Sequence, residues 1–128
     1  MAAVQVQPQT RRLTTIAALL RLEGLAVLIG AIALYAAQYG DWLAFILLLF
    51  VPDLSMIGYG RGSSTGAALY NAAHTYLAPA LLAAIGMLAS MPLLLQIALI
   101  WAAHIGMDRA LGYGLKYGAF KDTHLGRV

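Results

Sequence analysis

The chain consists of long apolar stretches separated by short polar breaks. Four stretches, 13–37, 42–59, 67–89 and 93–115, are predominantly apolar. Each has about the 20 residues that a helix needs to cross a bilayer. Apolar residues are continuous in them rather than alternating with polar ones, which favours helices over the strands of a membrane barrel. The pattern therefore predicts four transmembrane helices with these approximate bounds.

The breaks between the stretches are short, and neighbouring helices joined by short connections run antiparallel. Residues 38–41, 60–66 and 90–92 form these breaks, and a polar, basic tail follows at 116–128. A single integral membrane domain over 1–128 accommodates all of them. The predicted fold class is all-α, a four-helix transmembrane bundle with antiparallel neighbours.

The composition agrees with a membrane protein and excludes several other classes. Hydrophobic residues make up 62% of the chain and charged residues only 10%, whereas soluble domains carry about 25% charged residues. Cysteine is absent, which excludes disulfides and thiolate metal ligands. Arg21 and Glu23 interrupt the first apolar stretch, and no good cleavage motif follows it, so we expect a retained helix rather than a signal peptide.

Basic residues gather on one side of the predicted bundle. The formal net charge is +3, but the basic residues lie at the ends of apolar stretches, which argues against a nucleic-acid partner. Because cytoplasmic loops carry the excess of lysine and arginine, both termini and the 60–66 loop are predicted to be cytoplasmic. The expected location is the inner (plasma) membrane, the expected partners are its lipids, and the oligomeric state stays open. The basic residues on this side are Arg11, Arg12, Arg61, Arg109, Lys116, Lys121 and Arg127.

Ionisable side chains lie at similar depth in all four predicted helices. Counted from the cytoplasmic ends, they are about 9 to 17 Å into the bilayer, at about 1.5 Å per residue. Such groups are costly at membrane depth and normally face the interior of a bundle. We therefore expect one polar layer in the cytoplasmic half. Its members are Glu23, Asp53, His74, His104 and Asp108.

The spacing of these residues indicates a metal site. His104 and Asp108 are four residues apart and share one face of a helix. Asp53 follows a proline, which frees backbone carbonyls and often marks a helix that lines a site. Histidine nitrogens with carboxylate oxygens suit zinc, manganese or iron(II). The predicted ligands are Asp53, His74, His104 and Asp108, with Glu23 as the candidate general base.

Further polar residues are candidates for supporting roles. Tyr70 and Asn71 share a helix face with His74, and Asp122 and His124 lie in the tail, below the predicted cytoplasmic mouth. Two alternatives stay open. Pairing with arginine would make the layer a structural polar network, and chains of histidine and carboxylate groups also handle protons or ions in transporters. The supporting candidates are Arg21, Tyr70, Asn71, Arg109, Asp122 and His124.

Several short motifs carry a resemblance to a known family. They are Pro-Asp-Leu-Ser-Met at 52–56, Tyr-Asn-Ala-Ala-His at 70–74, Ala-His-Ile-Gly-Met-Asp-Arg at 103–109 and Lys-Asp-Thr-His-Leu-Gly-Arg at 121–127. Together they resemble the small bacterial membrane proteins catalogued as domain of unknown function 4260, over nearly the whole chain. The resemblance implies a membrane fold and brings no established activity.

A second resemblance concerns the order of the candidate ligands. Proline followed by Asp53, then His74, then His104 with Asp108 looks like the membrane-bound metal-dependent hydrolases. That group has a second aspartate where this chain has Ser55, so the implied ligand set is altered. The resemblance implies a metal-dependent hydrolase that acts on a lipid or another amphipathic substrate.

The predicted topology can be tested with reporter fusions. Fusions at the C-terminus and at Arg61 should report the cytoplasm, and fusions near Tyr39 and Met91 should report the exterior, because the cytoplasmic side retains the basic residues. An external C-terminus would contradict the predicted orientation.

Overall fold

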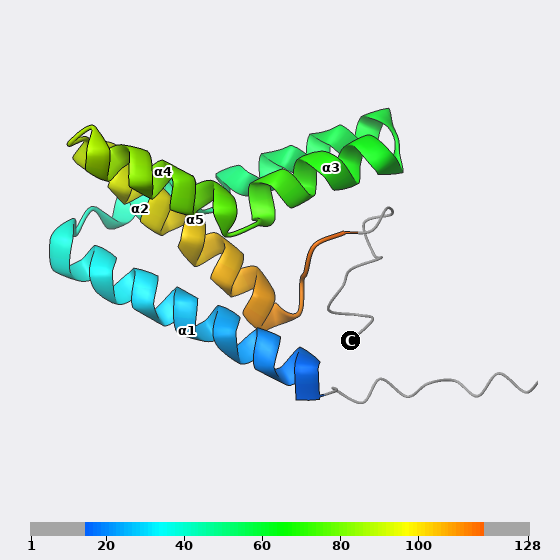
Figure 1. The fold of residues 1–128 in the computed structure, drawn as a ribbon, viewed down its shortest axis with the longest axis horizontal. Helices are drawn as coiled ribbons and strands as arrows, with labels where there is room; N and C mark the ends of the chain where they lie inside the picture. Colours follow the sequence, from blue (N-terminus) through cyan, green and yellow to red (C-terminus); the bar gives the residue numbers. More distant parts are fainter. Residues whose placement is uncertain (1–14, 117–128) are drawn as a thin grey trace, which may run out of the picture.

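The computed structural model describes residues 15–116, and all of their helices and turns form one connected bundle (Figure 1). The regular elements of this part of the chain are helical, which confirms the all-α prediction. In chain order they are α1 (Thr15–Gln38), α2 (Trp42–Leu49), the 3-10 helix η1 (Val51–Arg61), α3 (Ser63–His74), α4 (Leu77–Leu88) and α5 (Pro92–Leu111).

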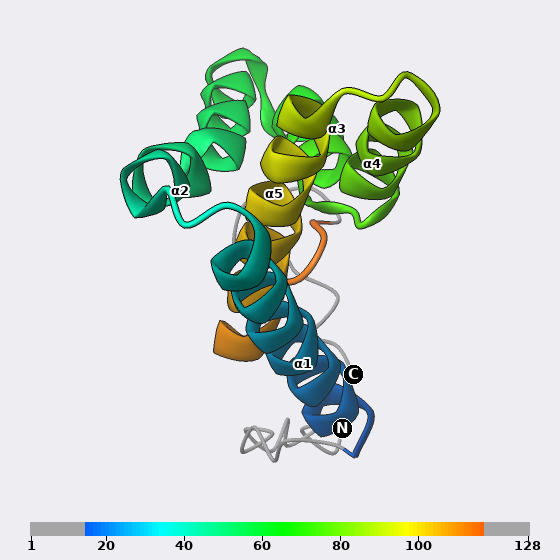
Figure 2. The same cartoon turned by 90° about the vertical axis from the view of Figure 1, so that its left-hand side faces the viewer.

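Helix α5 is the element around which the others are arranged. It packs against α1, α4 and α2, whereas α3 packs mainly against η1. Helix α1 lies along one side of α5 and α4 along another, while the hairpin of η1 and α3 diverges from α1 (Figures 1 and 2). A buried cluster joins α1, α2 and α5. Its members are Ala31, Tyr35, Phe45, Ile100 and Ala103.

Several helices are suited to a bilayer by length and composition. Three segments, Thr15–Gln38, Trp42–Arg61 and Pro92–Leu111, are long and apolar enough to cross a membrane, and the bent pair of α3 and α4 makes a fourth if it counts as one span. Large aliphatic side chains on α1, α2 and α4 stay exposed, as they do where helices contact lipid tails. These features indicate membrane insertion. The orientation and the antiparallel order stay predictions.

The predicted helix 42–59 corresponds to one helical segment, Trp42–Arg61, but its α-helical part stops at Leu49 and the chain continues as η1. Pro52 has no N–H, and its ring would clash with the Leu48 carbonyl in a continuous α-helix. The chain instead narrows to a 3-10 helix of 11 residues with Pro52 in its first turn. Such helices seldom exceed about 3–4 residues and often mark strained or functional segments.

The predicted helix 67–89 is also divided. Helix α3 ends at His74, Thr75 is extended with φ −93° and ψ 140°, and α4 continues at an angle of 44°. Pro79 explains the position of this break, since a proline ring clashes with the carbonyl four residues earlier, here that of Thr75. Both prolines were visible in the sequence, yet their effect on the helices was underestimated.

The last helix is shorter than its predicted range of 93–115. It ends at Leu111 because Gly112 adopts a left-handed conformation with φ +97°. The Gly112 and Tyr113 N–H groups then donate to the carbonyls of Arg109 and Asp108 at 3.1 and 2.8 Å, which is a Schellman motif. Asp108 consequently lies within one turn of the helix end, shallower than predicted.

Helices α1 and α5 touch at two glycines, and this contact can be tested. A Cβ at Gly106 would lie 2.6 Å from the Gly24 oxygen and 2.8 Å from the Leu28 nitrogen. Gly106→Ala should therefore lower the free energy of unfolding by about 1–3 kcal/mol, as overpacking does. Gly30→Ala is the matched control, because nothing lies within 4 Å of its added Cβ. Thermal unfolding in detergent compares them, and equal stability of the two variants would contradict the contact.

Candidate metal centre

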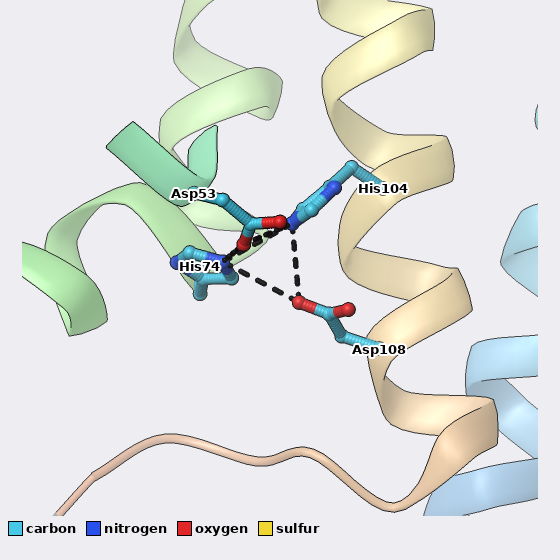
Figure 3. Close-up of side chains that lie close together, drawn as sticks. All are labelled: Asp53, His74, His104 and Asp108. Atoms are coloured by element: carbon cyan, nitrogen blue, oxygen red, sulfur yellow. Dashed lines mark hydrogen bonds and ion pairs between the residues drawn. The ribbon is translucent and has the colours of Figure 1, made fainter. Parts of the chain in front are cut away.

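Four ionisable side chains converge at the junction of η1, α3 and α5 (Figure 3). One ligand atom from each of Asp53, His74, His104 and Asp108 can be chosen so that all four atoms lie within 4.8 Å of one another. The histidine side chains are 0% exposed, Asp108 is 11% exposed and Asp53 is 40% exposed. The predicted clustering is thus confirmed for these residues, and the group reaches the surface at Asp53.

Two residues of the group lie beside helix breaks, and the other two lie on an unbroken helix. Asp53 follows Pro52 directly, in the first turn of η1. His74 is the last residue of α3, next to the break that Pro79 causes. His104 and Asp108 project from successive turns of α5, as their spacing predicted.

The five distances that involve an imidazole nitrogen are nearly equal, and all four ligand atoms lie within 4.8 Å of one another. His74 Nε2 lies 3.1 Å from His104 Nε2. Asp53 Oδ1 lies 3.3 Å from His74 Nε2 and 3.2 Å from His104 Nε2. Asp108 Oδ2 lies 3.4 and 3.1 Å from the same two nitrogens. Each imidazole nitrogen therefore has three neighbours at nearly equal distance.

These five separations are close to the edge length of a tetrahedral coordination shell. A zinc ion with ligands at about 2.0–2.1 Å separates its ligand atoms by about 3.3–3.4 Å, and the observed separations run from 3.1 to 3.4 Å. A charge-assisted hydrogen bond would instead single out one shorter contact, at about 2.7–2.9 Å.

The hydrogen-bond partner of His74 fixes the role of its other nitrogen. Nδ1 lies 2.8 Å from the Tyr70 carbonyl oxygen, which can only accept, so Nδ1 carries a proton. In the neutral ring, Nε2 then carries no proton, and its lone pair is directed at the group. The centre thus brings together two carboxylate oxygens and the Nε2 lone pair of His74, a donor set that a cation would complement.

Tyr70 holds the His74 ring in two ways. Besides accepting from Nδ1, it stacks its own ring on the imidazole, with centroids 3.8 Å apart and planes 6° from parallel. A carbonyl that accepts from the distal nitrogen orients a metal-ligating histidine and raises its basicity. Tyr70 was predicted as a supporting residue, and its contacts suit that role.

The break after α3 leaves carbonyls that α5 satisfies. Trp101 Nε1 donates to the Ala73 oxygen at 2.6 Å, and Arg109 donates to the His74 oxygen at 2.9 Å. Arg109 also donates to the Tyr113 oxygen at 3.2 Å. Trp101 was missed in the sequence, although it lies one turn before His104 on the same face.

The segment after α5 is fixed against α3. Asn71 Nδ2 donates to the Lys116 oxygen at 2.7 Å, and the Lys116 N–H donates to Asn71 Oδ1 at 2.6 Å. The Lys116 ammonium lies 5.0 Å from the centroid of the Tyr70 ring. Burial lowers the pKa of Lys116, Asp108 acts to raise this pKa, and Arg109 lowers it further. A positive charge thus lies beside the centre, separated from it by Tyr70.

Other predicted residues lie apart from the four. The predicted membership of Glu23 in the polar layer is wrong, because Glu23 is exposed on α1 and does not belong to the group. Its role as general base stays a prediction. Arg21 donates to the Ala110 oxygen at 3.1 Å. Within residues 15–116, Arg21 and Arg109 donate to backbone carbonyls, not to the four side chains. Asp122 and His124 lie outside the described residues.

Comparison with known proteins identifies a family and little else. The chain belongs to the family described as Domain of unknown function (DUF4260), whose model matches residues 17–128. No curated protein and no solved structure matches the chain significantly. The family resemblance seen in the sequence is therefore confirmed, while the likeness to membrane-bound metal-dependent hydrolases gains no support from these comparisons.

The clamp between Asn71 and Lys116 can be tested by removing its amide. Asn71→Leu loses both hydrogen bonds to the Lys116 backbone, so the free energy of unfolding should fall by about 1–3 kcal/mol. Ala72→Leu places the same side chain at an exposed neighbouring position of α3 and should change stability little. Thermal unfolding in detergent measures both. Wild-type stability of Asn71→Leu would show that the clamp contributes nothing.

Proposed function

We propose that this chain is a membrane metalloprotein that binds one divalent transition-metal ion through Asp53, His74, His104 and Asp108, and that it acts as a metal-dependent hydrolase. The nearly equal spacing of the ligand atoms around the two imidazole nitrogens carries the proposal, because it suits an ion between them better than a set of pairwise hydrogen bonds. The fixed tautomer of His74 is a second, independent support.

Zinc is the ion that the donor set favours most. Two imidazole nitrogens and two carboxylate oxygens at tetrahedral spacing are ligands that zinc commonly takes. Manganese and iron(II) accept the same donors but prefer more ligands. The exposed side of the group, at Asp53, would let a water molecule or a substrate oxygen complete such a shell.

The proposed chemistry is hydrolysis of an ester or phosphoester. A bound divalent ion would lower the pKa of a water molecule and polarise the substrate oxygen. The water oxygen forms a bond to the carbonyl carbon or phosphorus, and the bond to the leaving oxygen breaks. Asp53 would hold the ion through Oδ1, and its second carboxylate oxygen, on the exposed side of the group, would accept the proton of the water and pass it to the leaving oxygen. Glu23 remains the alternative base that the sequence suggested.

The competing interpretation is a network without an ion. Protonated histidines would form ion pairs with both aspartates at the distances observed. Such a network would fix the packing of α3 against α5 and would need no catalytic step. A proton-handling protein would use the same groups. Metal content separates these interpretations from the proposal.

The proposal predicts one metal ion per chain after purification in detergent without chelator. His104→Ala should lose the ion, because it removes the ligand whose Nε2 lies within 3.2 Å of a ligand atom of each of the three others. Glu23→Gln is the matched control, since it neutralises a carboxylate outside the group and should retain the ion. Metal per chain is measured by mass spectrometry. Less than about 0.1 equivalents in the wild type, with His104→Ala unchanged, would identify a salt-bridge network and end the proposal.

The hydrolase part has its own test. Metal-loaded protein is assayed with p-nitrophenyl decanoate and with bis(p-nitrophenyl) phosphate, with His104→Ala as the inactive control. Turnover that chelator abolishes and zinc restores is expected for at least one probe. Full metal occupancy without turnover of either probe would refute hydrolysis of these bonds and leave the metal site standing.

A further inference from the structure

A cavity of about 310 Å³ lies close along the chain to the four-residue group, although none of the four side chains is among its lining residues. It lies between the end of α2, the start of η1, the end of α3 and the middle of α5. Two of its wall residues, Pro52 and Ala73, directly precede the ligands Asp53 and His74. Its volume is at the lower end of the range for small-molecule sites, which is about 300–1,000 Å³. The lining residues are Leu48, Val51, Pro52, Ser55, Ala73, Ile97, Ile100 and Trp101.

The cavity and the group share one face of α5. Ile97, Trp101, His104 and Asp108 follow one another at spacings of four, three and four, which puts them in a single row along the helix. At about 1.5 Å per residue, the row from Ile97 to His104 spans about 10 Å. A molecule in the cavity would therefore extend from the group toward the N-terminal end of α5.

The polar atoms in the cavity wall already have partners within the protein. Ser55 Oγ donates to the Pro52 oxygen at 2.8 Å, and Trp101 Nε1 donates to the Ala73 oxygen at 2.6 Å. The remaining wall is formed by aliphatic and aromatic carbon. Since these wall groups are paired, the cavity suits an apolar occupant better than a polar one.

The wall is continuous with the surface that contacts lipid. Leu48 and Val51 are 36% and 47% exposed and belong to the segment Trp42–Arg61, which is suited to crossing a membrane. An apolar molecule could thus enter from the bilayer without passing through water. In that environment alkyl chains are the abundant apolar groups of suitable shape.

We propose that the cavity binds the single alkyl chain of a membrane amphiphile, with its polar head at Asp53, His74, His104 and Asp108. This rests on the proposed function and names its substrate class, a single-chain lipid ester or phosphoester. A larger groove of about 510 Å³ lies between α1 and α4. Its α5 wall, which includes Leu95 and Ala102, belongs to the opposite face of the helix, so it does not serve this site.

Trp101 provides a direct readout of the occupant. The chain has two tryptophans, so Trp42→Phe leaves Trp101 as the sole fluorophore in the cavity wall. The probe is 10-bromodecanoate, whose carboxylate mimics a hydrolysis product and whose bromine quenches indole fluorescence on contact. In phosphatidylcholine nanodiscs loaded with zinc, quenching should saturate with probe concentration, and unbrominated decanoate should reverse it by competition.

Matched variants locate the binding. Ile97→Phe fills the cavity, so the half-saturating probe concentration should rise about tenfold, as expected for overpacking of a formed site. Leu93→Phe introduces the same side chain four residues earlier, at a position that is 60% exposed and outside the lining. Its half-saturating probe concentration should equal that of the parent. In Trp101→Phe protein, Trp42 should show only quenching that rises linearly with the probe.

The outcomes separate this proposal from the metal site. Linear quenching of Trp101 that decanoate cannot reverse would overturn the chain-binding cavity, whatever the metal content of the protein. Saturable quenching with unchanged affinity in His104→Ala would overturn the placement of the head at the four residues. Saturable quenching that weakens in both His104→Ala and Ile97→Phe would support the whole proposal.

Discussion

The structure depends on one electrostatic constraint, which is the meeting of two carboxylate oxygens and two imidazole nitrogens at the junction of η1, α3 and α5. Two imidazole nitrogens lie 3.1 Å apart, with a carboxylate oxygen on either side. His74 cannot relieve the repulsion by changing tautomer, because Tyr70 holds its other nitrogen as a donor. At membrane depth, water is a poor source of compensation. A proton on His104 Nε2, a protonated carboxylate or a cation at the centre would each relieve this repulsion.

The fold brings these atoms together by interrupting two helices and leaving a third intact. Pro52 and Pro79 break the chain on either side of the η1–α3 hairpin, and each break leaves a ligand beside it. Broken helices expose carbonyls, which are costly in lipid unless they find donors. Trp101 and Arg109 supply those donors from α5. The helix that carries two of the ligands therefore also stabilises the break beside a third.

Sequence reasoning found the four clustered side chains because polar groups are rare in these apolar segments and two of them share one helix face. A histidine and an aspartate at spacing four share a face in any α-helix. A carboxylate directly after a proline in an apolar segment is costly to bury, so its presence indicates a polar environment. It did not find the breaks themselves, since proline position alone does not show whether a helix kinks or stops. Trp101 was also missed, because a tryptophan in an apolar helix reads as ordinary packing until its N–H partner is known.

The placement of Glu23 shows why equal depth is a weak argument for contact. Depth gives position along the membrane normal, but the direction around the helix axis decides which neighbour a side chain meets. On α5, Gly106 lies half a turn away from both His104 and Asp108, and α1 packs on that glycine. Helix α1 therefore covers the back of α5, away from the candidate ligands. Its contribution is mechanical, because it supports α5, the unbroken helix against which the other candidate ligands are aligned.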